Sequence, residues 1–337
     1  MTNNNIAADP NWWPHRYDPQ KGHVHYVKAT REDHRNATFL TDEYLKEANK
    51  PKAVSLNSAI GAGEVTPIHF IFHSAYCCST LLARAFDLPG LSMGLKEPQI
   101  LNDLSGWRLR GAKPEQLAPI MSDVLKVLSR PLKQGEKNII KPSNVTNGLA
   151  GLMLHVRPDA KAVFLYAPLR DFLGSIARKG MWGRLWVREL LTKQLREGLV
   201  NIGLQGEDYL KLTDLQVAAV GWIAQHQLFD QIVKQFGTDR VRTLNSRKLM
   251  ADQTLAMQNL VDHFEVPLKQ NDLKDLVSGP VFQRHSKSDT EFDASAREAE
   301  RIEGDKQHAE EIEKVIGWAE AVAKNVSLPM NLSASLV

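Results

Sequence analysis

The sequence predicts a three-layer α/β fold, in which helices cover both faces of a mostly parallel sheet. Two observations support this prediction. Short apolar segments of strand length alternate with longer segments of helical periodicity, and the first apolar segment runs into a compact polar loop and then into an amphipathic helix. A strand, a tight loop and a helix N-terminus in this order form an anion cradle, because free backbone N–H groups and the positive end of the helix dipole point into the loop.

Each element is predicted from its local pattern. The expected strands lie at 68–73, 91–95, 137–141, 161–166 and 240–244. The expected helices lie at 79–88, 114–129, 146–155, 170–179, 183–203, 210–236 and 252–265, and a charged helical stretch at 291–325 carries one apolar stripe. The apolar run Val163-Phe164-Leu165-Tyr166 is typical of a buried central strand of a parallel sheet.

The length of 337 residues favours one large domain with additions, or two domains. We expect an α/β domain at 67–290, preceded by an irregular N-terminal extension at 1–66 and followed by a C-terminal helix and tail at 291–337. Aromatic residues among polar ones predict that the extension packs on the main domain. His23 and His25 would share one face of a strand within it, but no third ligand is evident nearby, so no metal site is predicted.

Composition excludes several classes of function. The 42 basic and 39 acidic residues give a formal charge of +3, so there is no bulk electrostatic case for binding nucleic acid or a membrane. The only cysteines, Cys77 and Cys78, are adjacent, which leaves no disulfide framework. The first residues lack the pattern of a signal peptide, and no apolar run approaches the roughly 18–20 residues of a membrane span. We therefore expect a cytoplasmic protein.

The loop from His73 to Thr80 departs from the nucleotide-binding pattern G-x-x-x-x-G-K-[ST], because it lacks both glycines and the lysine. A metal-dependent kinase needs that lysine on the transferred phosphoryl group, so the chain is a poor candidate for an ordinary NTPase. An alternative is a plain strand-to-helix turn in which Ser79 is the N-cap. The loop alone does not decide between anion binding and this structural role.

The segment Ser74-Ala75-Tyr76-Cys77-Cys78-Ser79-Thr80-Leu81-Leu82 resembles the S-x-R-S-G-S-T-L-L loop of sulfotransferases that use 3′-phosphoadenosine 5′-phosphosulfate (PAPS). That family has a fold like the P-loop nucleoside triphosphate hydrolases, and its loop holds the 5′-phosphosulfate. Tyr76 stands where the family has a basic residue, and Cys78 where it has glycine. The resemblance implies that the donor is bound by Ser74, Ala75, Tyr76, Cys77, Cys78, Ser79 and Thr80.

Two further segments extend this resemblance. Lys96-Glu97-Pro98 follows the strand at 91–95, where several sulfotransferases place a glutamate that is their general base. Lys141 ends the strand at 137–141, where relatives have a lysine that reaches the acceptor or the sulfuryl group. The resemblance therefore implies that Glu97 takes the acceptor proton and that Lys141 stabilises the transferring group. The alternatives are a helix N-terminal carboxylate for Glu97 and an exposed strand-end lysine for Lys141.

The expected site for the 3′-phosphate follows the strand at 161–166. The segment from Ala167 to Ser175 resembles the family pattern R-x-P-x-D-x-x-x-S at Asp171 and Ser175, whereas Ala167 replaces its arginine. The resemblance implies Ser175 as a phosphate donor, and Arg170 is the candidate to replace the missing arginine. The alternative for Ser175 is a small residue that packs the helix. Further along the chain, a basic segment supplies Arg284 and Lys287 as additional candidates, or is a solvated loop.

We therefore expect an enzyme that transfers a sulfuryl group from PAPS to a hydroxyl or amine of a small-molecule or glycan-type acceptor, with no metal. Two alternatives remain open: a divergent P-loop kinase, and an inactive nucleotide-binding protein of the same fold. The acceptor pocket is expected in the tryptophan-bearing region 181–222 and the N-terminal segment. Trp182, Trp186 and Trp222 would line it, although large aromatic side chains are more often core residues.

Overall fold

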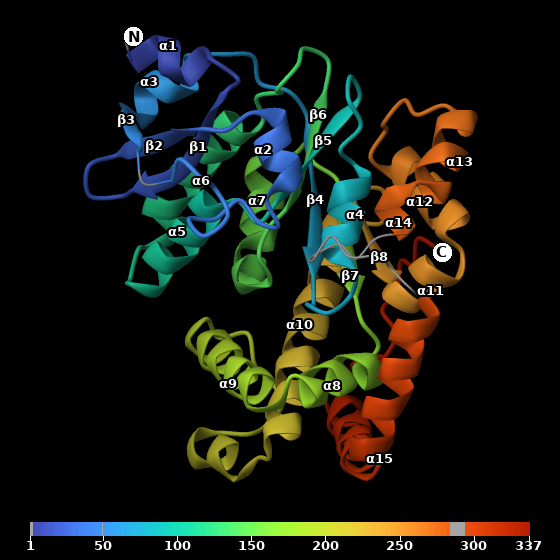
Figure 1. The fold of residues 1–337 in the computed structure, drawn as a ribbon. Helices are drawn as coiled ribbons and strands as arrows, with labels where there is room; N and C mark the ends of the chain where they lie inside the picture. Colours follow the sequence, from blue (N-terminus) through green and yellow to red (C-terminus); the bar gives the residue numbers. More distant parts are fainter. Residues whose placement is uncertain (1–2, 49, 284–293) are drawn as a thin grey trace.

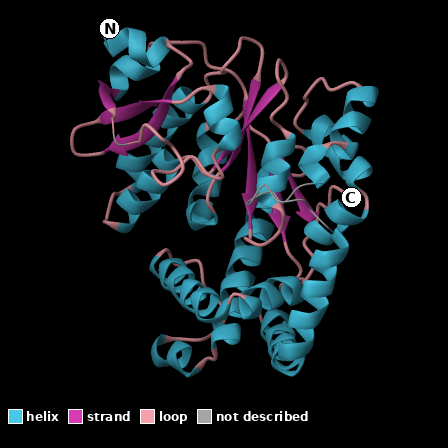
Figure 2. Ribbon diagram, in the orientation of Figure 1, coloured by secondary structure: helices cyan, strands magenta, loops and turns pink. Residues whose placement is uncertain are grey.

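The computed structural model describes residues 3–48, 50–283 and 294–337 (Figure 1). Its centre is a five-stranded sheet, parallel throughout, with the strand order β5-β6-β4-β7-β8. The strands are β4 (Ile68–His73), β5 (Ser92–Lys96), β6 (Lys137–Lys141), β7 (Ala162–Tyr166) and β8 (Val241–Asn245). Helices lie on both sides of the sheet (Figure 2). The predicted α/β class is confirmed, and every expected strand is present to within one residue.

The expected helices of the α/β region are also present, with shifted ends. They are α4 (Ser79–Ala85), α6 (Pro114–Leu128), η1 (Asn144–Leu149) with α7 (Ala150–Val156), α8 (Leu169–Arg178), α9 (Gly180–Arg196), α10 (Asp214–Phe236), α12 (Gln253–His263) and α15 (Ala294–Asn325). The pattern did not predict α5 (Gln99–Leu109), η2 (Gly206–Lys211), α11 (Ser246–Ala251), α13 (Gln270–Ser278) or α14 (Pro280–Gln283). In α5, the pair Ser105-Gly106 lowers helix propensity inside the element and obscures its periodicity.

Alternation along the strands divides the apolar core between the two faces of the sheet. Phe70 and Phe72 of β4 join a cluster with residues of α6, α7 and the side of α10 that carries Phe229. Ile71, between them, joins the cluster that includes α4, α8, α12 and the other side of α10. Because successive side chains of a strand point to opposite faces, this split gives the three layers that the sequence predicts.

The N-terminal segment is ordered, in contrast to the irregular extension expected. It forms α1 (Asn3–Ala8), α2 (Arg31–Asn36), α3 (Leu56–Ile60) and an antiparallel sheet of β1 (Trp12–Asp18), β2 (His23–Lys28) and β3 (Lys52–Ser55). A register shift at Pro14/Arg16 interrupts the alternation of β1, which explains why the sequence pattern hides this strand. We call residues 3–48 and 50–60 the N-terminal module.

The N-terminal module and the C-terminal segment both form hydrogen bonds to edge strands of the parallel sheet. The Leu40 N–H donates to the carbonyl oxygen of Lys96 at the end of β5 (2.7 Å), and Arg31 donates to the carbonyl oxygen of Ser92 (2.9 Å). At the opposite edge, Thr243 of β8 accepts from the Leu336 N–H (2.8 Å) and donates to the Ala334 carbonyl oxygen (2.9 Å). Both edge strands therefore have neighbours from outside the parallel sheet.

The topology marks one end of the sheet as the place for a ligand. After β4 the chain crosses towards β5, whereas after β7 it continues in the other direction to β8. Ligands of open α/β sheets bind outside the carboxyl ends of the strands at such a reversal. In Figure 1, α8 and α9 lie beyond these carboxyl ends, below the sheet. In the described ranges, no helix is both long enough and apolar enough to cross a membrane.

Candidate active site

The loop after β4 has a backbone conformation that glycine favours, although it contains no glycine. Ala75, Tyr76 and Cys78 have φ values of 71°, 52° and 65°. Cys78 is the N-cap of α4 and Ser79 its first helical residue, so Ser79 does not have the alternative role of an N-cap. Left-handed conformations at non-glycine residues cost about 1–3 kcal/mol each and collect at functional sites. The structure thus adopts a cradle-like loop without the usual sequence signature.

Hydrogen bonds to the neighbouring strand hold this loop in place. The Ser74 Oγ accepts from the Ala167 N–H at 3.1 Å, and the Ser74 N–H donates to the Leu165 carbonyl oxygen, also at 3.1 Å. The buried Cys77 thiol donates to the same carbonyl oxygen at 3.3 Å. Burial raises the pKa of this thiol to about 11, against a smaller opposing effect of the nearby positive charge of Lys141. The Cys77 side chain therefore anchors the loop, and only its backbone is available to a ligand.

The Tyr76 side chain is also packed. Its ring meets Phe172 of α8 and Trp186 of α9 edge-on, with centroid distances of 6.1 Å and 5.5 Å. Burial raises the pKa of Tyr76 to about 12, so the phenol stays neutral at physiological pH. Tyr76 thus links the loop to α8 and α9.

Glu97 and Lys141 form an ion pair at the carboxyl ends of β5 and β6. The Lys141 Nζ donates to the Glu97 Oε1, and the Glu97 N–H donates to the Lys141 carbonyl oxygen at 2.7 Å. Glu97 has a left-handed backbone, with φ of 53°. The Lys141 side chain is only 1% exposed, in contrast to the alternative of an exposed strand-end lysine, while the Glu97 side chain is 17% exposed. The structure therefore brings these two predicted residues into contact.

His73 is a third member of this cluster, and the sequence did not identify it as a site residue. Its Nδ1 accepts from the Ala75 N–H at 3.1 Å, so the neutral ring carries its proton on Nε2. That Nε2 lies 3.9 Å from the Glu97 Oε1. The Asn147 Nδ2 donates to the His73 carbonyl oxygen at 3.0 Å and fixes the end of β4. His73 therefore connects the loop to the Glu97–Lys141 pair; its signal in the sequence was its place as the last residue of the strand before the loop.

A second buried lysine lies beside this cluster. Lys96, the last residue of β5, is buried and donates from Nζ to the Arg35 carbonyl oxygen at 3.0 Å. Burial, reinforced by the charge of Arg84, lowers the pKa of Lys96 to about 7. Because Lys96 is paired with Lys141 in the register of β5 and β6, two lysines end adjacent strands beside the loop.

The residues predicted for the 3′-phosphate lie on α8, which follows β7. Arg170 forms an ion pair with Glu313 of α15, and Asp171 accepts two hydrogen bonds from Arg247, at 2.6 and 2.7 Å. The Ser175 Oγ donates to the Asp171 carbonyl oxygen at 2.8 Å and accepts from Arg178 at 3.2 Å.

The structure thus engages Arg170 with the last helix and places a different basic residue, Arg178, beside Ser175. Arg284 and Lys287 lie outside the described residues. Across 3–48, 50–283 and 294–337, no group of three or more His, Cys, Asp or Glu side chains is arranged to hold a metal ion.

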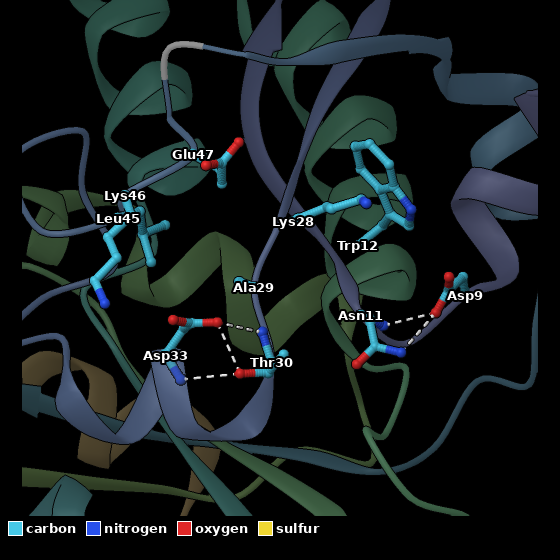
Figure 3. Close-up of a pocket in the computed structure, with 10 residues that line it drawn as sticks. All are labelled: Asp9, Asn11, Trp12, Lys28, Ala29, Thr30, Asp33, Leu45, Lys46 and Glu47. Atoms are coloured by element: carbon cyan, nitrogen blue, oxygen red, sulfur yellow. Dashed lines mark hydrogen bonds between the residues drawn. The ribbon is translucent and has the colours of Figure 1, made fainter.

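Two pockets bear on the search for a substrate site. One, of about 320 Å³, is lined by α5, η1 and α9 and includes Trp186, the residue that meets Tyr76. The other, of about 340 Å³, lies on the N-terminal module, where the Lys28 Nζ lies 5.7 Å from the Trp12 ring centroid (Figure 3). None of the predicted site residues lines the second pocket.

The aromatic side chains expected to form an acceptor pocket divide into three environments. Trp222 is fully buried and donates from Nε1 to the Ala167 carbonyl oxygen at 2.9 Å, so it is a core residue. Trp186 lines the 320 Å³ pocket, and Trp182 is 61% exposed. Phe39, from the N-terminal module, lies over Lys141, with 5.3 Å between Nζ and the ring centroid.

Comparison with known proteins gives matches in structure alone. No protein-family model matches the chain, and no curated protein matches it. The chain is similar to the sulfotransferase domain of the curacin biosynthetic pathway, with 15% identity and a TM-score of 0.46 over 80% of this chain and 100% of that one.

The chain is also similar to the sulfotransferase domain of the Synechococcus olefin synthase, with 15% identity and a TM-score of 0.40 over 69% of this chain and 83% of that one. A sulfotransferase from Mycobacterium avium matches with 12% identity and a TM-score of 0.43 over 76% and 78%. These three solved structures share 12–15% sequence identity with this chain.

Proposed function

We propose that this protein is a sulfotransferase that moves a sulfuryl group from PAPS to a hydroxyl or amine of a small-molecule or glycan-type acceptor. The observation that carries the proposal is the contact of Glu97 with Lys141, next to His73 and the left-handed loop, at the carboxyl ends of adjacent parallel strands. This is where an open α/β sheet places its ligand.

The residues present fit an anionic donor, with the positive charge supplied from strand ends and not from the loop. Residues 74–80 carry no basic side chain, but Lys141 is near enough for its charge to lower the pKa of the Cys77 thiol, and Lys96 ends the neighbouring strand. The backbone of residues 74–78 and the hydroxyls of Ser79 and Thr80 would hold the phosphosulfate, with Lys141 supplying the charge that Tyr76 does not. Ser175 and Arg178 would hold the 3′-phosphate on α8.

The chemistry requires one base. The acceptor oxygen or nitrogen forms a bond to sulfur, the bond from sulfur to the phosphate oxygen breaks, and adenosine 3′,5′-bisphosphate leaves. Glu97 accepts the acceptor proton, and Lys141 stabilises negative charge on the transferring group. The Nε2 of His73 lies 3.9 Å from the Glu97 Oε1, where its N–H would help to orient the carboxylate.

Calorimetry with adenosine 3′,5′-bisphosphate tests donor binding, and a radiolabelled PAPS assay with a panel of alcohols, phenols and amines tests transfer. We expect Glu97→Gln to bind the bisphosphate as the wild type does and to lose about 10²- to 10⁴-fold in turnover. Glu115→Gln, at an exposed position in the first turn of α6, is the matched control and should retain full turnover.

Absence of bisphosphate binding by the wild type would contradict the proposal. Thermal stabilisation by ATP and Mg²⁺ without a response to the bisphosphate would instead favour a kinase. Bisphosphate binding with no transfer to any acceptor, in wild type and Glu97→Gln alike, would favour an inactive nucleotide-binding protein.

A further inference from the structure

The 320 Å³ pocket between α5, η1 and α9 has the volume of a small-ligand site. Its apolar wall consists of Leu109 from α5, Val145 from η1, and Trp186 and Leu190 from α9. The Lys193 Nζ donates to the Ser105 Oγ at 2.6 Å and pairs with Glu197 at 3.0 Å, so the cation at the border of the pocket is already neutralised. Asn102, Gly106 and the exposed Glu189 complete the lining, so the apolar part of the pocket is the wall of four side chains.

Each wall of the pocket is connected to the candidate active site. Helix α5 begins two residues after Glu97, and η1 begins three residues after Lys141. Helix α9 contributes Trp186, whose ring meets that of Tyr76 in the loop. A molecule in this pocket therefore lies between the three segments that start at, or contact, the groups proposed for transfer.

The apolar surface continues along α9. Trp182, Trp186, Glu189 and Lys193 follow one another at spacings of four, three and four residues, so they share one face of the helix. Trp182 is 61% exposed, although large aromatic side chains are normally buried. Leu185, one turn before Glu189, is 56% exposed on the same side of α9. Trp182 and Leu185 thus form an exposed apolar strip that leads along α9 to Trp186 at the pocket, while Glu189 and Lys193 add charge to the far end of the same face.

The positions along α5 set the length of a suitable molecule. The pocket residues of this helix run from Asn102 to Leu109, which lie about 5 to 15 Å along the axis from its first residue, Gln99. An acceptor whose hydroxyl group reaches Glu97 must therefore be elongated if its other end fills the pocket.

We propose that this pocket binds the apolar body of an elongated alcohol acceptor, whose hydroxyl group reaches Glu97. The assignment rests on the sulfuryl-transfer function proposed above and narrows its acceptor class to apolar alcohols. Burial of each methylene group in such a pocket strengthens binding by up to about fourfold.

The test measures binding of primary alcohols from 1-butanol to 1-nonanol to the full chain, by calorimetry and tryptophan fluorescence. We expect the dissociation constant of the wild type to fall about two- to fourfold with each added methylene. Leu109→Trp fills the pocket from a half-buried position and should abolish this dependence on chain length. The matched control is Leu195→Trp, which adds the same bulk to a partly exposed position on α9 outside the pocket. It should bind like the wild type.

Gly106→Leu is a second filling variant, because a Cβ there meets only the flexible end of Arg110, at 3.0 Å. Affinity independent of chain length in the wild type, or an unchanged dependence in both filling variants, would overturn the assignment. Adenosine 3′,5′-bisphosphate is titrated into the same preparations. If the bisphosphate binds but alcohol affinity does not depend on chain length, the pocket assignment alone is refuted. If alcohol affinity rises with chain length but the bisphosphate does not bind, the transfer function is refuted, and with it the role of the alcohol as acceptor.

Discussion

At the scale of single residues, the candidate site depends on backbone conformations that its side chains do not favour. Cys78 and Tyr76 adopt positive φ where the resembling family has glycine and a basic residue. The Ser74 bond to Ala167 and the buried Cys77 thiol hold the backbone in this form. The loop is therefore held by its neighbours on β7 and would not be expected to keep its shape in isolation.

The buried ammonium group of Lys96 makes stability depend on pH. Burial lowers its pKa to about 7, whereas an unfolded lysine has a pKa of about 10.4, so between these values the unfolded chain binds more protons than the folded one. The free energy of unfolding therefore contains a contribution that rises with pH across this window. We expect the free energy of unfolding of the wild type, minus that of Lys96→Met, to rise by up to about 1.4 kcal/mol per pH unit. Urea unfolding at about pH 6, 8 and 10 measures it.

Lys133→Met, at an exposed position, is the matched control and should show no such pH dependence. A difference between wild type and Lys96→Met that stays constant from about pH 6 to 10 would show that the folded state does not depress the Lys96 pKa.

At the scale of elements, the position of α4 depends on its close approach to β5. A Cβ at Gly94 of β5 would lie 1.7 Å from the Ala83 carbonyl oxygen of α4, so only glycine fits there. Because α4 directly follows the loop, any movement of the helix also displaces the anion cradle. The packing of α4 on the sheet and the geometry of the site are thus coupled.

We therefore expect Gly94→Ala to lower the free energy of unfolding by about 3 kcal/mol and to weaken binding of adenosine 3′,5′-bisphosphate. Denaturant unfolding and calorimetry measure the two effects. Gly151→Ala in α7 is the control: a Cβ there has no heavy atom within 4 Å, so the substitution should stabilise the protein by about 0.4–1 kcal/mol. Equal effects of the two substitutions would refute the close approach of α4.

The elements that the sequence predicts are those whose pattern is local. Each strand of the parallel sheet contains a short apolar stretch, which is continuous in Ala162–Tyr166 of β7. The order of these stretches along the chain places Glu97 and Lys141 at strand ends without knowledge of any contact. The contacts of His73 with Ala75 and Glu97 depend on how the loop folds back, and Phe39 reaches Lys141 from a distant segment. The periodicity of a single sequence carries no information about such contacts, so only the structure identifies these parts of the site.

At the scale of the whole molecule, the N-terminal module and the parallel sheet share one apolar core. Trp13 and Tyr26 belong to the same buried cluster as Phe70 of β4. Arg16 adds an ion pair with Asp103 of α5 at 2.9 Å, and the partly buried position of that pair gives it more weight than a surface one. The module therefore has no apolar core separate from that of the sheet.

We expect the protein to unfold in one cooperative transition, because separating the module from the sheet would expose this shared core. Five of the seven tryptophans lie outside the module, so the part of the fluorescence signal that is lost in a Trp12→Phe/Trp13→Phe variant reports on the module. Far-ultraviolet circular dichroism reports on all helices and strands. The two signals should change at the same denaturant concentration. An early fluorescence change followed by a separate dichroism change would show that the module unfolds independently.

The hydrogen bonds at the two edges of the parallel sheet have a consequence for behaviour in concentrated solution. An edge strand with unpaired N–H and C=O groups is a template on which another chain adds as a further strand. Leu40 and Arg31 occupy carbonyl groups of β5, and the segment around Leu336 occupies both backbone groups of Thr243 in β8. The flanking segments thus shield the sheet from edge-to-edge polymerisation, and a variant that loosens either one would be prone to fibril growth before it lost its fold.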